Sequence, residues 1–215
     1  MFEERPEAVF LKTLNVLYVE DERVTREKIS SLLKRRVANL AIAGDGVEGL
    51  ESFKANPASL VITDIQMPRM DGLAMAKEIR RRSPSVLIVV TTAFEQPDYL
   101  AQAISIGIAH YVTKPIQLER FEFALLSCAH RLQAAGSPVA SSSLPGEERE
   151  RLEQLTGRER EVLTSVGRGL ASHEIGQLLG ISPRTVNTHL ANIMAKLSMH
   201  KSNALAAFAV RAGLL

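Results

Sequence analysis

The first 132 residues alternate short apolar runs with segments of helical pattern, and this alternation constrains the fold more than any other feature. Each run is rich in Val, Ile or Leu and too short for a helix. Strands that alternate with helices predict βαβ units and a parallel sheet. The five predicted strands are Leu14–Val19, Ala38–Ala43, Leu60–Thr63, Val86–Thr91 and Ala109–Val112. Helices are predicted near Val24–Arg36, Val47–Lys54, Leu73–Arg81, Pro97–Ile106 and Leu118–Leu132.

A chain of 215 residues favours two domains. Residues 12–132 carry the alternating pattern and form the first predicted domain. Small and polar residues broken by Pro and Gly follow, and they predict a flexible linker over residues 133–148. Residues 149–215 show helical patterns without a strand pattern. The predicted architecture is an α/β domain with a five-stranded, doubly wound, flavodoxin-like parallel sheet, followed by a small four-helix, all-α domain.

The composition and the amino-terminal residues indicate the cellular compartment in which we expect the protein. The chain is 46% hydrophobic and 23% charged, which is typical of globular proteins. Its apolar runs fall well short of the roughly 20 residues that a transmembrane helix needs. The first ten residues are acidic and lack the apolar core of a secretory signal. Cys128 is the sole cysteine, which excludes an intramolecular disulfide. We therefore expect a cytoplasmic protein without a membrane partner.

The C-terminal end of the chain is cationic. From Val162 onward its one acidic residue is Glu174. The basic residues there are Arg168, Arg184, Lys196, Lys201 and Arg211. A compact basic region makes nucleic acid a candidate partner. On charge alone, an ordinary solvated face explains the same pattern equally well.

Residues capable of phosphate chemistry follow four of the predicted strands. Right-handed βαβ units place the carboxyl ends of all strands at one edge of the sheet, where ligands bind. Glu20 and Asp21 follow the first strand, Asp64 the third, Thr92 the fourth and Lys114 the fifth. Clustered carboxylates suit a hard cation such as Mg²⁺, and a lysine neutralises a phosphoryl group beside them. A single strand-end Asp is commonly a helix cap, so the prediction rests on the four ends together.

With D-I-Q-M-P-R-M-D-G at residues 64–72, this pattern resembles the receiver domain of two-component response regulators across nearly all of residues 12–132. The resemblance implies that Asp64 takes a phosphoryl group from a sensor histidine kinase. It also implies a Mg²⁺ site that includes the backbone carbonyl of Gln66. The implied metal-binding residues are Glu20, Asp21, Asp64 and Gln66.

The same resemblance assigns roles to the residues after the fourth and fifth strands. Lys114 would pair with the phosphoryl charge, and the Thr92 hydroxyl would bond a phosphoryl oxygen. Thr92 and Tyr111 would form the switch, with Tyr111 becoming buried as Thr92 moves. The Lys114-Pro115 peptide would be cis. Glu20 departs from the family pattern, in which Asp is more usual at the first acidic position.

The alternative is an aspartyl phosphohydrolase, an enzyme that also uses a strand-end Asp with Mg²⁺ and a lysine. Such an enzyme needs a second Asp two residues after the nucleophile as its acid and base. That position is Gln66 here, which cannot exchange a proton usefully. We therefore expect a phosphoacceptor that catalyses its own phosphorylation and dephosphorylation rather than an enzyme acting on other substrates.

The second domain contains two helices in close succession. Ser182 is a good N-cap, and Pro183 is favoured at the first helical position. The preceding helix starts near Ser172 and ends at Gly180, which suits a left-handed C-cap. Two helices joined by residues 180–182 predict a helix-turn-helix.

With L-T-G-R-E-R-E-V-L at residues 155–163, residues 150–215 resemble the DNA-binding domain of LuxR-type regulators. The whole chain resembles the NarL/FixJ subfamily of response regulators. The resemblance implies an inverted repeat of double-stranded DNA as partner and a homodimer when phosphorylated. The implied DNA contacts are Arg184, Thr185, Asn187, Thr188, Ala191, Lys196, His200 and Lys201. Asn187 stands where the family usually has Lys, and Asn can pair bidentately with adenine.

Two hypotheses about function follow from the sequence. In the first, phosphorylation of Asp64 drives dimerisation and sequence-specific DNA binding, and the protein regulates transcription. In the second, the protein binds DNA constitutively and its receiver is a phosphorylation-independent interaction module. Dependence of DNA binding on phosphorylation distinguishes them.

Overall fold

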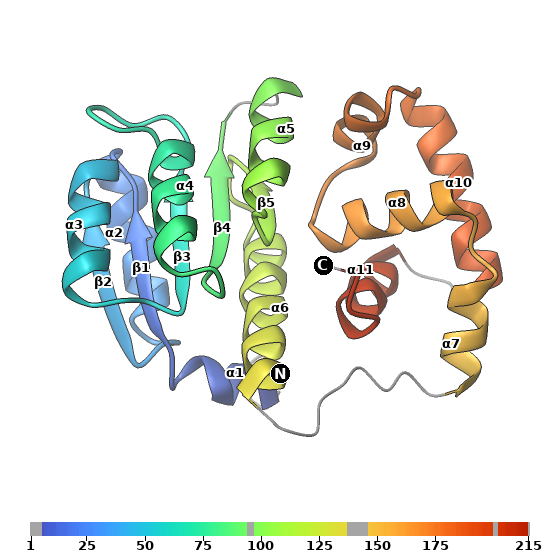
Figure 1. The fold of residues 1–215 in the computed structure, drawn as a ribbon, viewed down its shortest axis with the longest axis horizontal. Coiled ribbons are helices and arrows are strands. Elements are labelled where there is room, and N and C mark those ends of the chain that lie inside the picture. Colours follow the sequence, from blue (N-terminus) through green and yellow to red (C-terminus); the bar gives the residue numbers. More distant parts are fainter. Residues whose placement is uncertain (1–5, 94–96, 137–145, 200–201, 215) are drawn as a thin grey trace. The chain divides into compact units, whose positions relative to one another are not determined.

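The computed structural model describes residues 6–93, 97–136, 146–199 and 202–214. The chain divides into two units, with the division between Gln133 and Ala134. Figure 1 shows a sheet with flanking helices in the first unit and helices alone in the second. Within the described residues, no helix is long and apolar enough to cross a bilayer.

The first unit is built on five parallel strands in the order β2-β1-β3-β4-β5. The strands are β1 (Asn15–Val19), β2 (Asn39–Ala43), β3 (Leu60–Asp64), β4 (Leu87–Thr92) and β5 (His110–Thr113). The chain runs outward from β1 to β2 and then returns across β1 to β3. Ligands of such sheets bind where the strand order reverses, which here is the carboxyl edge of β1 and β3. The predicted five-stranded parallel sheet is confirmed.

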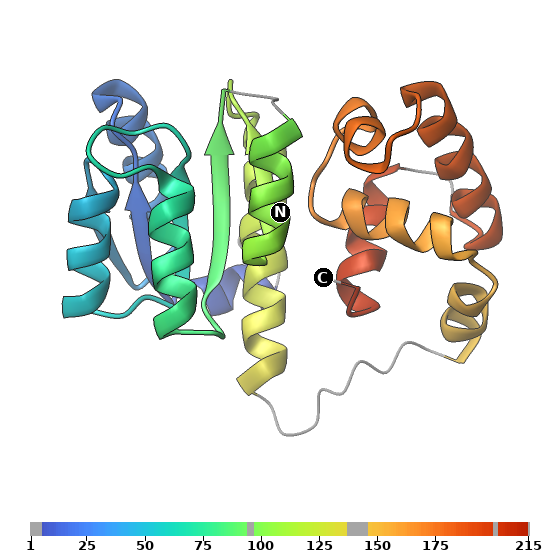
Figure 2. The same ribbon diagram turned by 45° about the horizontal axis from the view of Figure 1, so that its top comes forward.

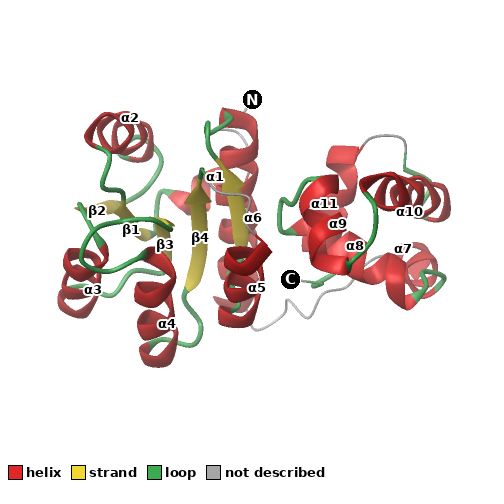
Figure 3. Ribbon diagram, turned by 90° about the horizontal axis from the view of Figure 1, so that it is seen from above, coloured by secondary structure: helices red, strands yellow, loops and turns green. Residues whose placement is uncertain are grey.

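The helices of the first unit cover both faces of the sheet. On one face lie α2 (Arg23–Leu33) and α6 (Leu118–Gly136), and on the other α3 (Gly46–Ala55), α4 (Gly72–Arg82) and α5 (Pro97–Ile106), as Figures 2 and 3 show. Tyr18, Ile62 and Phe121 are among the fully buried side chains between the sheet and α2 and α6. Cys128 of α6 lies in the same core, and burial raises its pKa to about 12. The thiol is therefore protonated and unreactive at neutral pH.

A helix that the sequence did not predict, α1 (Pro6–Leu11), precedes the first strand. Its Ala8 and Leu11 are buried, and Leu11 belongs to the same hydrophobic cluster as Leu33 and Phe121. Figure 1 places α1 at the amino ends of the strands, beside α6. The first unit thus begins before residue 12, where the prediction placed its start. A six-residue helix is too short to show helical periodicity in the sequence.

The predicted linker is helical at both ends. Helix α6 continues to Gly136, and α7 (Gly146–Glu153) is the first helix that lies wholly in the second unit. Ala134 and Ala135 are strong helix formers, and acidic residues in the first turn of α7 favour a helix amino terminus. The remaining part of the predicted linker, residues 137–145, lies outside the described residues.

The second unit contains the predicted helix-turn-helix. After α7 come α8 (Gly157–Gly167), α9 (Ser172–Leu179), α10 (Pro183–Lys196) and α11 (Ser202–Arg211), so α7 is an addition to the four predicted helices. Gly180 ends α9 with a φ of 65°, in the left-handed region that favours glycine. Ser182 caps α10 by accepting a hydrogen bond from the Thr185 N–H at 3.1 Å. The core between α8, α9, α10 and α11 includes Val162, Ile175, Val186, Ile193 and Phe208.

One arginine joins two loops of the first unit. Arg80, in the last turn of α4, donates hydrogen bonds through Nη1 to the carbonyl oxygens of Pro84 and Val86, both at 2.6 Å. Its Nε and Nη2 donate to the carbonyl oxygens of Ile106 and Gly107 at 3.2 and 2.9 Å. The guanidinium thereby ties the α4–β4 loop to the end of α5.

Replacing Arg80 by Ala should therefore lower the free energy of unfolding of the receiver unit by about 2 kcal/mol, because several carbonyl groups lose a charged donor. Calorimetry of the full chain checks this, with Arg82→Ala as the control. Arg82 is an exposed residue of the same helix turn, so its replacement should leave the receiver transition nearly unchanged. Equal effects of the two substitutions would contradict the role assigned to Arg80.

A buried carboxylate joins α8 to α10 in the second unit. Glu159 Oε2 accepts hydrogen bonds from the Thr156 N–H at 2.8 Å and from Lys196 Nζ of α10 at 2.7 Å. Burial alone would raise the pKa of Glu159, but the Lys196 ammonium and the Thr156 donors hold it below its ordinary value. The ionised form of Glu159 thus stabilises the packing of α10 on α8.

A depressed pKa in the folded state gives stability that is present above the ordinary pKa of 4.5 and lost as the pH falls through the folded value. Glu159→Gln should therefore destabilise the second unit at pH 7 by about 1 to 3 kcal/mol. As the pH falls below 4.5, the free energy of unfolding of Glu159→Gln should also decrease less steeply than that of the wild type. Thermal unfolding at several pH values measures both effects. Glu161→Gln, an exposed neighbour on α8, is the control and should match the wild type. An unchanged acid profile in Glu159→Gln would refute the assignment.

Candidate functional site

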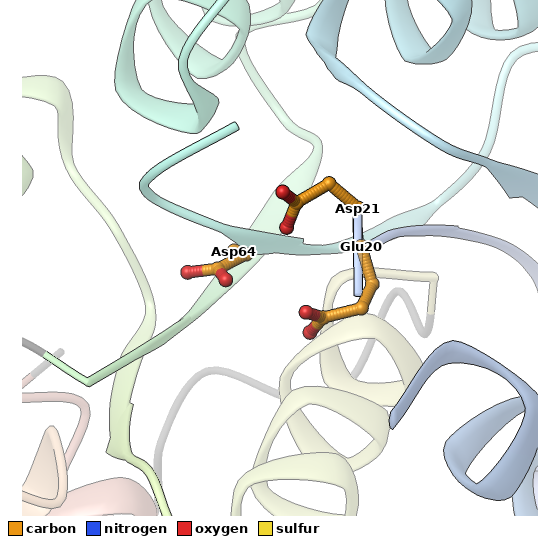
Figure 4. A group of neighbouring side chains, drawn as sticks. All are labelled: Glu20, Asp21 and Asp64. Atoms are coloured by element: carbon orange, nitrogen blue, oxygen red, sulfur yellow. The ribbon is translucent and has the colours of Figure 1, made fainter. Parts of the chain in front are cut away.

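Three carboxylates meet at the carboxyl edge of the sheet. Glu20 and Asp21 follow β1, and Asp64 ends β3. One carboxylate oxygen of each residue lies within 4.8 Å of those of the other two. Figure 4 shows the three carboxylates turned to the same side. Glu20 and Asp64 are buried and Asp21 is exposed, so the cluster is open to solvent at Asp21.

Lys114 places its ammonium between two of these carboxylates. Its Nζ lies 2.6 Å from Asp64 Oδ2 and 2.7 Å from Glu20 Oε1. The lysine follows β5, its N–H donates to the Thr92 carbonyl at 2.7 Å, and its peptide bond to Pro115 is cis, as the resemblance implied. Burial raises the pKa of Glu20, and Lys114 opposes the rise. Burial alone would lower the pKa of Lys114, but its bonds to Asp64 and Glu20 raise it, so it stays charged.

Hydrogen bonds position both the side chain and the backbone carbonyl of Asp64. Its Oδ1 accepts a hydrogen bond from the Ile65 N–H at 2.6 Å, and its carbonyl oxygen accepts one from Thr63 Oγ1 at 2.8 Å. Gly72, at the start of α4, packs directly behind it. A Cβ at Gly72 would lie 1.8 Å from the Asp64 carbonyl oxygen, so glycine is required for this close approach.

Two residues that the sequence analysis missed hold the acidic pair. Arg26 of α2 donates through Nη1 to the carbonyl oxygens of Glu20 and Asp21 at 2.6 and 2.8 Å. The Tyr18 hydroxyl lies 3.4 Å from Glu20 Oε2, and burial raises the pKa of this tyrosine. Tyr18 shares a sheet face with Glu20 because they are two residues apart, and that spacing is a signal in the sequence. No local sequence pattern predicts that the Arg26 side chain extends to these carbonyl groups.

The loop after Asp64 is fastened to α3. Arg69, whose φ is 65°, donates through Nε to Asp45 Oδ2 at 2.5 Å and through Nη2 to Glu48 Oε1 at 2.8 Å. Burial alone would raise the pKa of Asp45, but the α3 N–H groups and Arg69 hold it below its ordinary value. The Gly46 N–H also donates to the Met70 carbonyl at 3.2 Å. The loop that leads from Asp64 to α4 is thus anchored on a neighbouring helix.

The other residues predicted for this site lie on adjacent strands and loops. Thr92 is buried at the end of β4, beside the strand that carries Asp64. Tyr111 is buried within β5 opposite Val90, two residues before the Thr92–Thr113 pair. Gln66 is exposed, and its side-chain N–H donates to the Tyr99 hydroxyl of α5 at 3.2 Å. The structure thus brings Glu20, Asp21, Asp64 and Lys114 into one cluster and puts Thr92 at the next strand end.

The donor set of the cluster fits Mg²⁺. Its ligand atoms are carboxylate oxygens, which this cation prefers to nitrogen or sulfur. Three carboxylates and one ammonium give a formal charge of −2, which a divalent cation balances. The open side at Asp21 leaves room for water and phosphate oxygens, which Mg²⁺ commonly retains in protein sites.

A second set of predicted residues lies on α10. Five of them are exposed: Arg184, Thr185, Asn187, Thr188 and Ala191. The spacing of 184, 187, 188 and 191 puts four of these side chains on one face of the helix. In helix-turn-helix domains the second helix enters the major groove of DNA, and the residues near its amino terminus contact base edges.

The remaining predicted DNA contacts are differently placed. Lys196 is half-buried, and besides its ion pair with Glu159 its Nζ donates to the Gln154 carbonyl at 3.3 Å. It therefore has a structural role that the sequence did not reveal, and its contact with phosphate stays a prediction. His200 and Lys201 lie outside the described residues.

Two family models and many known proteins match the chain. Residues 16–125 match the response regulator receiver domain, and residues 153–209 match the bacterial regulatory proteins of the luxR family. The transcriptional regulatory protein YhcZ of Bacillus subtilis is 28% identical over 208 residues, which cover 92% of this chain and 96% of that protein. The response regulator protein VraR of Staphylococcus aureus is 28% identical over 197 residues, or 87% of this chain and 91% of that protein.

A solved structure matches both units. RcsB from Salmonella enterica serovar Typhimurium, bound to promoter P1flhDC in the presence of the phosphomimetic BeF₃⁻, is 25% identical with a TM-score of 0.50. The match covers 93% of this chain and 98% of RcsB. Response regulators of this family are DNA-binding regulators rather than classical enzymes. The carboxylate cluster lies in the segment matched by the receiver model, and the exposed face of α10 lies in the segment matched by the luxR model. The chain therefore belongs to the two-component response regulators that join a receiver domain to a LuxR-type DNA-binding domain.

Proposed function

We propose that Asp64 accepts a phosphoryl group from a sensor histidine kinase, and that phosphorylation drives dimerisation and sequence-specific DNA binding. The observation that carries the first part is the pairing of Asp64 Oδ2 with Lys114 Nζ at 2.6 Å, beside two further carboxylates. A carboxylate is a competent nucleophile for an acyl phosphate when nearby positive charge shields the incoming group.

In the proposed transfer, an oxygen of Asp64 forms a bond to phosphorus while the bond from phosphorus to the histidine nitrogen of the kinase breaks. The electron pair of that bond stays on the imidazole, which takes up a proton from solvent. The Ile65 N–H holds Asp64 Oδ1 in place during attack. Lys114 neutralises the phosphoryl oxygens, since its ammonium already lies against the accepting carboxylate.

Glu20, Asp21, Asp64 and the carbonyl of Gln66 would hold Mg²⁺ at this site. When bound, the cation supplies the positive charge that offsets repulsion between the phosphoryl group and the carboxylates. Arg26 and Tyr18 keep the acidic pair in position through their bonds to the Glu20 and Asp21 carbonyls and to the Glu20 carboxylate.

The proposed switch consists of Thr92 and Tyr111. A phosphoryl group on Asp64 would attract the Thr92 hydroxyl from the adjacent strand end. The Tyr111 side chain would then move into the space that Thr92 leaves. Two discrete arrangements of these side chains would bias the surface at which the receivers pair. Because DNA is the proposed target, we also propose that the protein acts in the cytoplasm.

Asp64→Asn should abolish Mg²⁺-dependent labelling by acetyl phosphate, because an amide is not a usable nucleophile. Phosphate-affinity electrophoresis and intact-protein mass measure the labelling, and circular dichroism checks the fold. Asp71→Asn is the matched control: Asp71 caps α4 by accepting from the Ala74 N–H, and Asn caps helices equally well. Persistent labelling of Asp64→Asn, or loss of labelling in Asp71→Asn, would overturn the assignment.

The proposed DNA surface is the exposed face of α10, formed by Arg184, Asn187, Thr188 and Ala191. Thr185 flanks this face. We propose that Asn187, Thr188 and Ala191 face the major groove and that Arg184, Lys196, His200 and Lys201 contact phosphates. RcsB, to which the chain is similar, is bound to a promoter in its solved structure. A two-fold dimer should read an inverted repeat with half-sites about one helical turn apart, or a multiple of it.

Asn187→Ala should cost about 1 to 3 kcal/mol at one base position of each half-site and relax the preference there alone. Arg184→Ala, which removes a phosphate contact, should weaken binding to all sequences alike and reduce the salt slope by about 0.9. The phosphorylated protein is titrated, at several salt concentrations, against operators in which single base pairs are substituted. These titrations distinguish the two patterns. A uniform loss of affinity in Asn187→Ala would show that Asn187 is a backbone contact.

A further inference from the structure

A hydrogen bond joins the two helices of the helix-turn-helix at the proposed DNA surface. Ser172 Oγ, in the first turn of α9, donates to Asn187 Oδ1 of α10 at 2.7 Å. The two residues are 15 positions apart, so this contact exists only in the folded domain. Its acceptor is the residue proposed to read a base edge.

The Ser172 hydroxyl is available for this contact because Ser172 is not the N-cap residue of α9. Serine at a helix start ordinarily caps the helix with its side-chain oxygen. Here the N-cap residue is Ala171, and its N–H donates to the Glu174 carboxylate at 2.5 Å. Glu174 thus accepts from the N-cap N–H, and the serine hydroxyl, which lies one position further on, reaches across to α10.

With this bond formed, the Asn187 amide presents its Nδ2 end outward. Oδ1 is turned toward Ser172, and in the part of the chain that the structure describes nothing accepts a hydrogen bond from Nδ2. Asn187 is exposed, so both N–H groups of Nδ2 remain available to a ligand. An unrestrained asparagine could present either its oxygen or its nitrogen.

The major-groove edges of the purines differ in the donors and acceptors that they offer. Guanine presents two adjacent acceptors, N7 and O6, whereas adenine presents the acceptor N7 beside the N6 donor. Bidentate pairing with adenine requires the amide to offer its oxygen and its nitrogen together. Pairing with guanine requires donors alone.

We propose that Ser172 is a specificity-determining positioning residue: it holds Asn187 as a hydrogen-bond donor toward DNA, so that guanine is favoured over adenine at the contacted position. The inference rests on the proposed function, in which α10 enters the major groove. It goes further by naming the base and the residue that selects it.

The test uses the full-length protein, phosphorylated with acetyl phosphate and Mg²⁺, and binding sites selected from random DNA. The base position at which Asn187→Ala loses its sequence preference is the position that Asn187 contacts. Dissociation constants are then measured with each of the four bases at that position. We expect the wild type to prefer guanine to adenine by about tenfold. Ser172→Ala should reduce that ratio at least about fivefold, with unchanged affinity for unrelated DNA.

Two further variants separate positioning from a general structural role. Ser172→Thr keeps the hydroxyl and should keep the guanine preference. Ser172→Ala should have no additional effect in an Asn187→Ala background, because residues that act through one contact are not additive. Thermal unfolding verifies that each variant is folded.

Three results would overturn the proposal. The wild type could prefer adenine, or the ratio of guanine to adenine affinity could be unchanged in Ser172→Ala. The third is a further change in affinity when Ser172→Ala is added to Asn187→Ala. Failure of the proposed function looks different: the phosphorylated wild type would select no common sequence, or Asn187→Ala would weaken all sequences alike. Either of those results would remove the basis of the inference as well.

Discussion

The ammonium of Lys114 is the interaction on which the receiver site depends. It lies against both Asp64 and Glu20, and without it two buried carboxylates would face each other across the end of the sheet with no counter-charge. Breaking a buried ion pair by removing one partner is strongly destabilising, because the other charge is left buried without compensation. The same charge therefore stabilises the resting site and suits it to phosphate chemistry.

The scaffold fixes the geometry around that charge through the parallel sheet. Strand order brings the ends of β1 and β3 together, and β5 delivers Lys114 beyond β4. Gly72 allows α4 to start against the Asp64 carbonyl, and Arg69 fastens the intervening loop to Asp45. In the second unit, Lys196 and the buried Glu159 play a comparable part, because their ion pair fixes α10 on α8. In both units a buried charge pair orients an element that carries proposed functional residues.

Much of this was predictable because sheet topology follows from hydrophobic pattern. Once five apolar runs are assigned to parallel strands, residues after those runs must share one edge, and Asp64, Glu20, Asp21 and Lys114 are found there. The contacts of Arg26 and Ser172 were not predictable in the same way. Each depends on how one helix is placed against a neighbouring segment, which no local spacing encodes. Helix α1 escaped prediction because six residues show no period, although Leu11 is fully buried.

The claim at the centre of this account is that chemistry at Asp64 controls the DNA affinity of the second domain. The most direct measurement is the dissociation constant of the full chain for its selected operator, with and without stoichiometric phosphorylation by acetyl phosphate. The account predicts tighter binding when the protein is phosphorylated, together with a shift from monomer to dimer in sedimentation. Equal affinity in both states, with phosphorylation verified by mass, would contradict it and favour a constitutive DNA-binding protein.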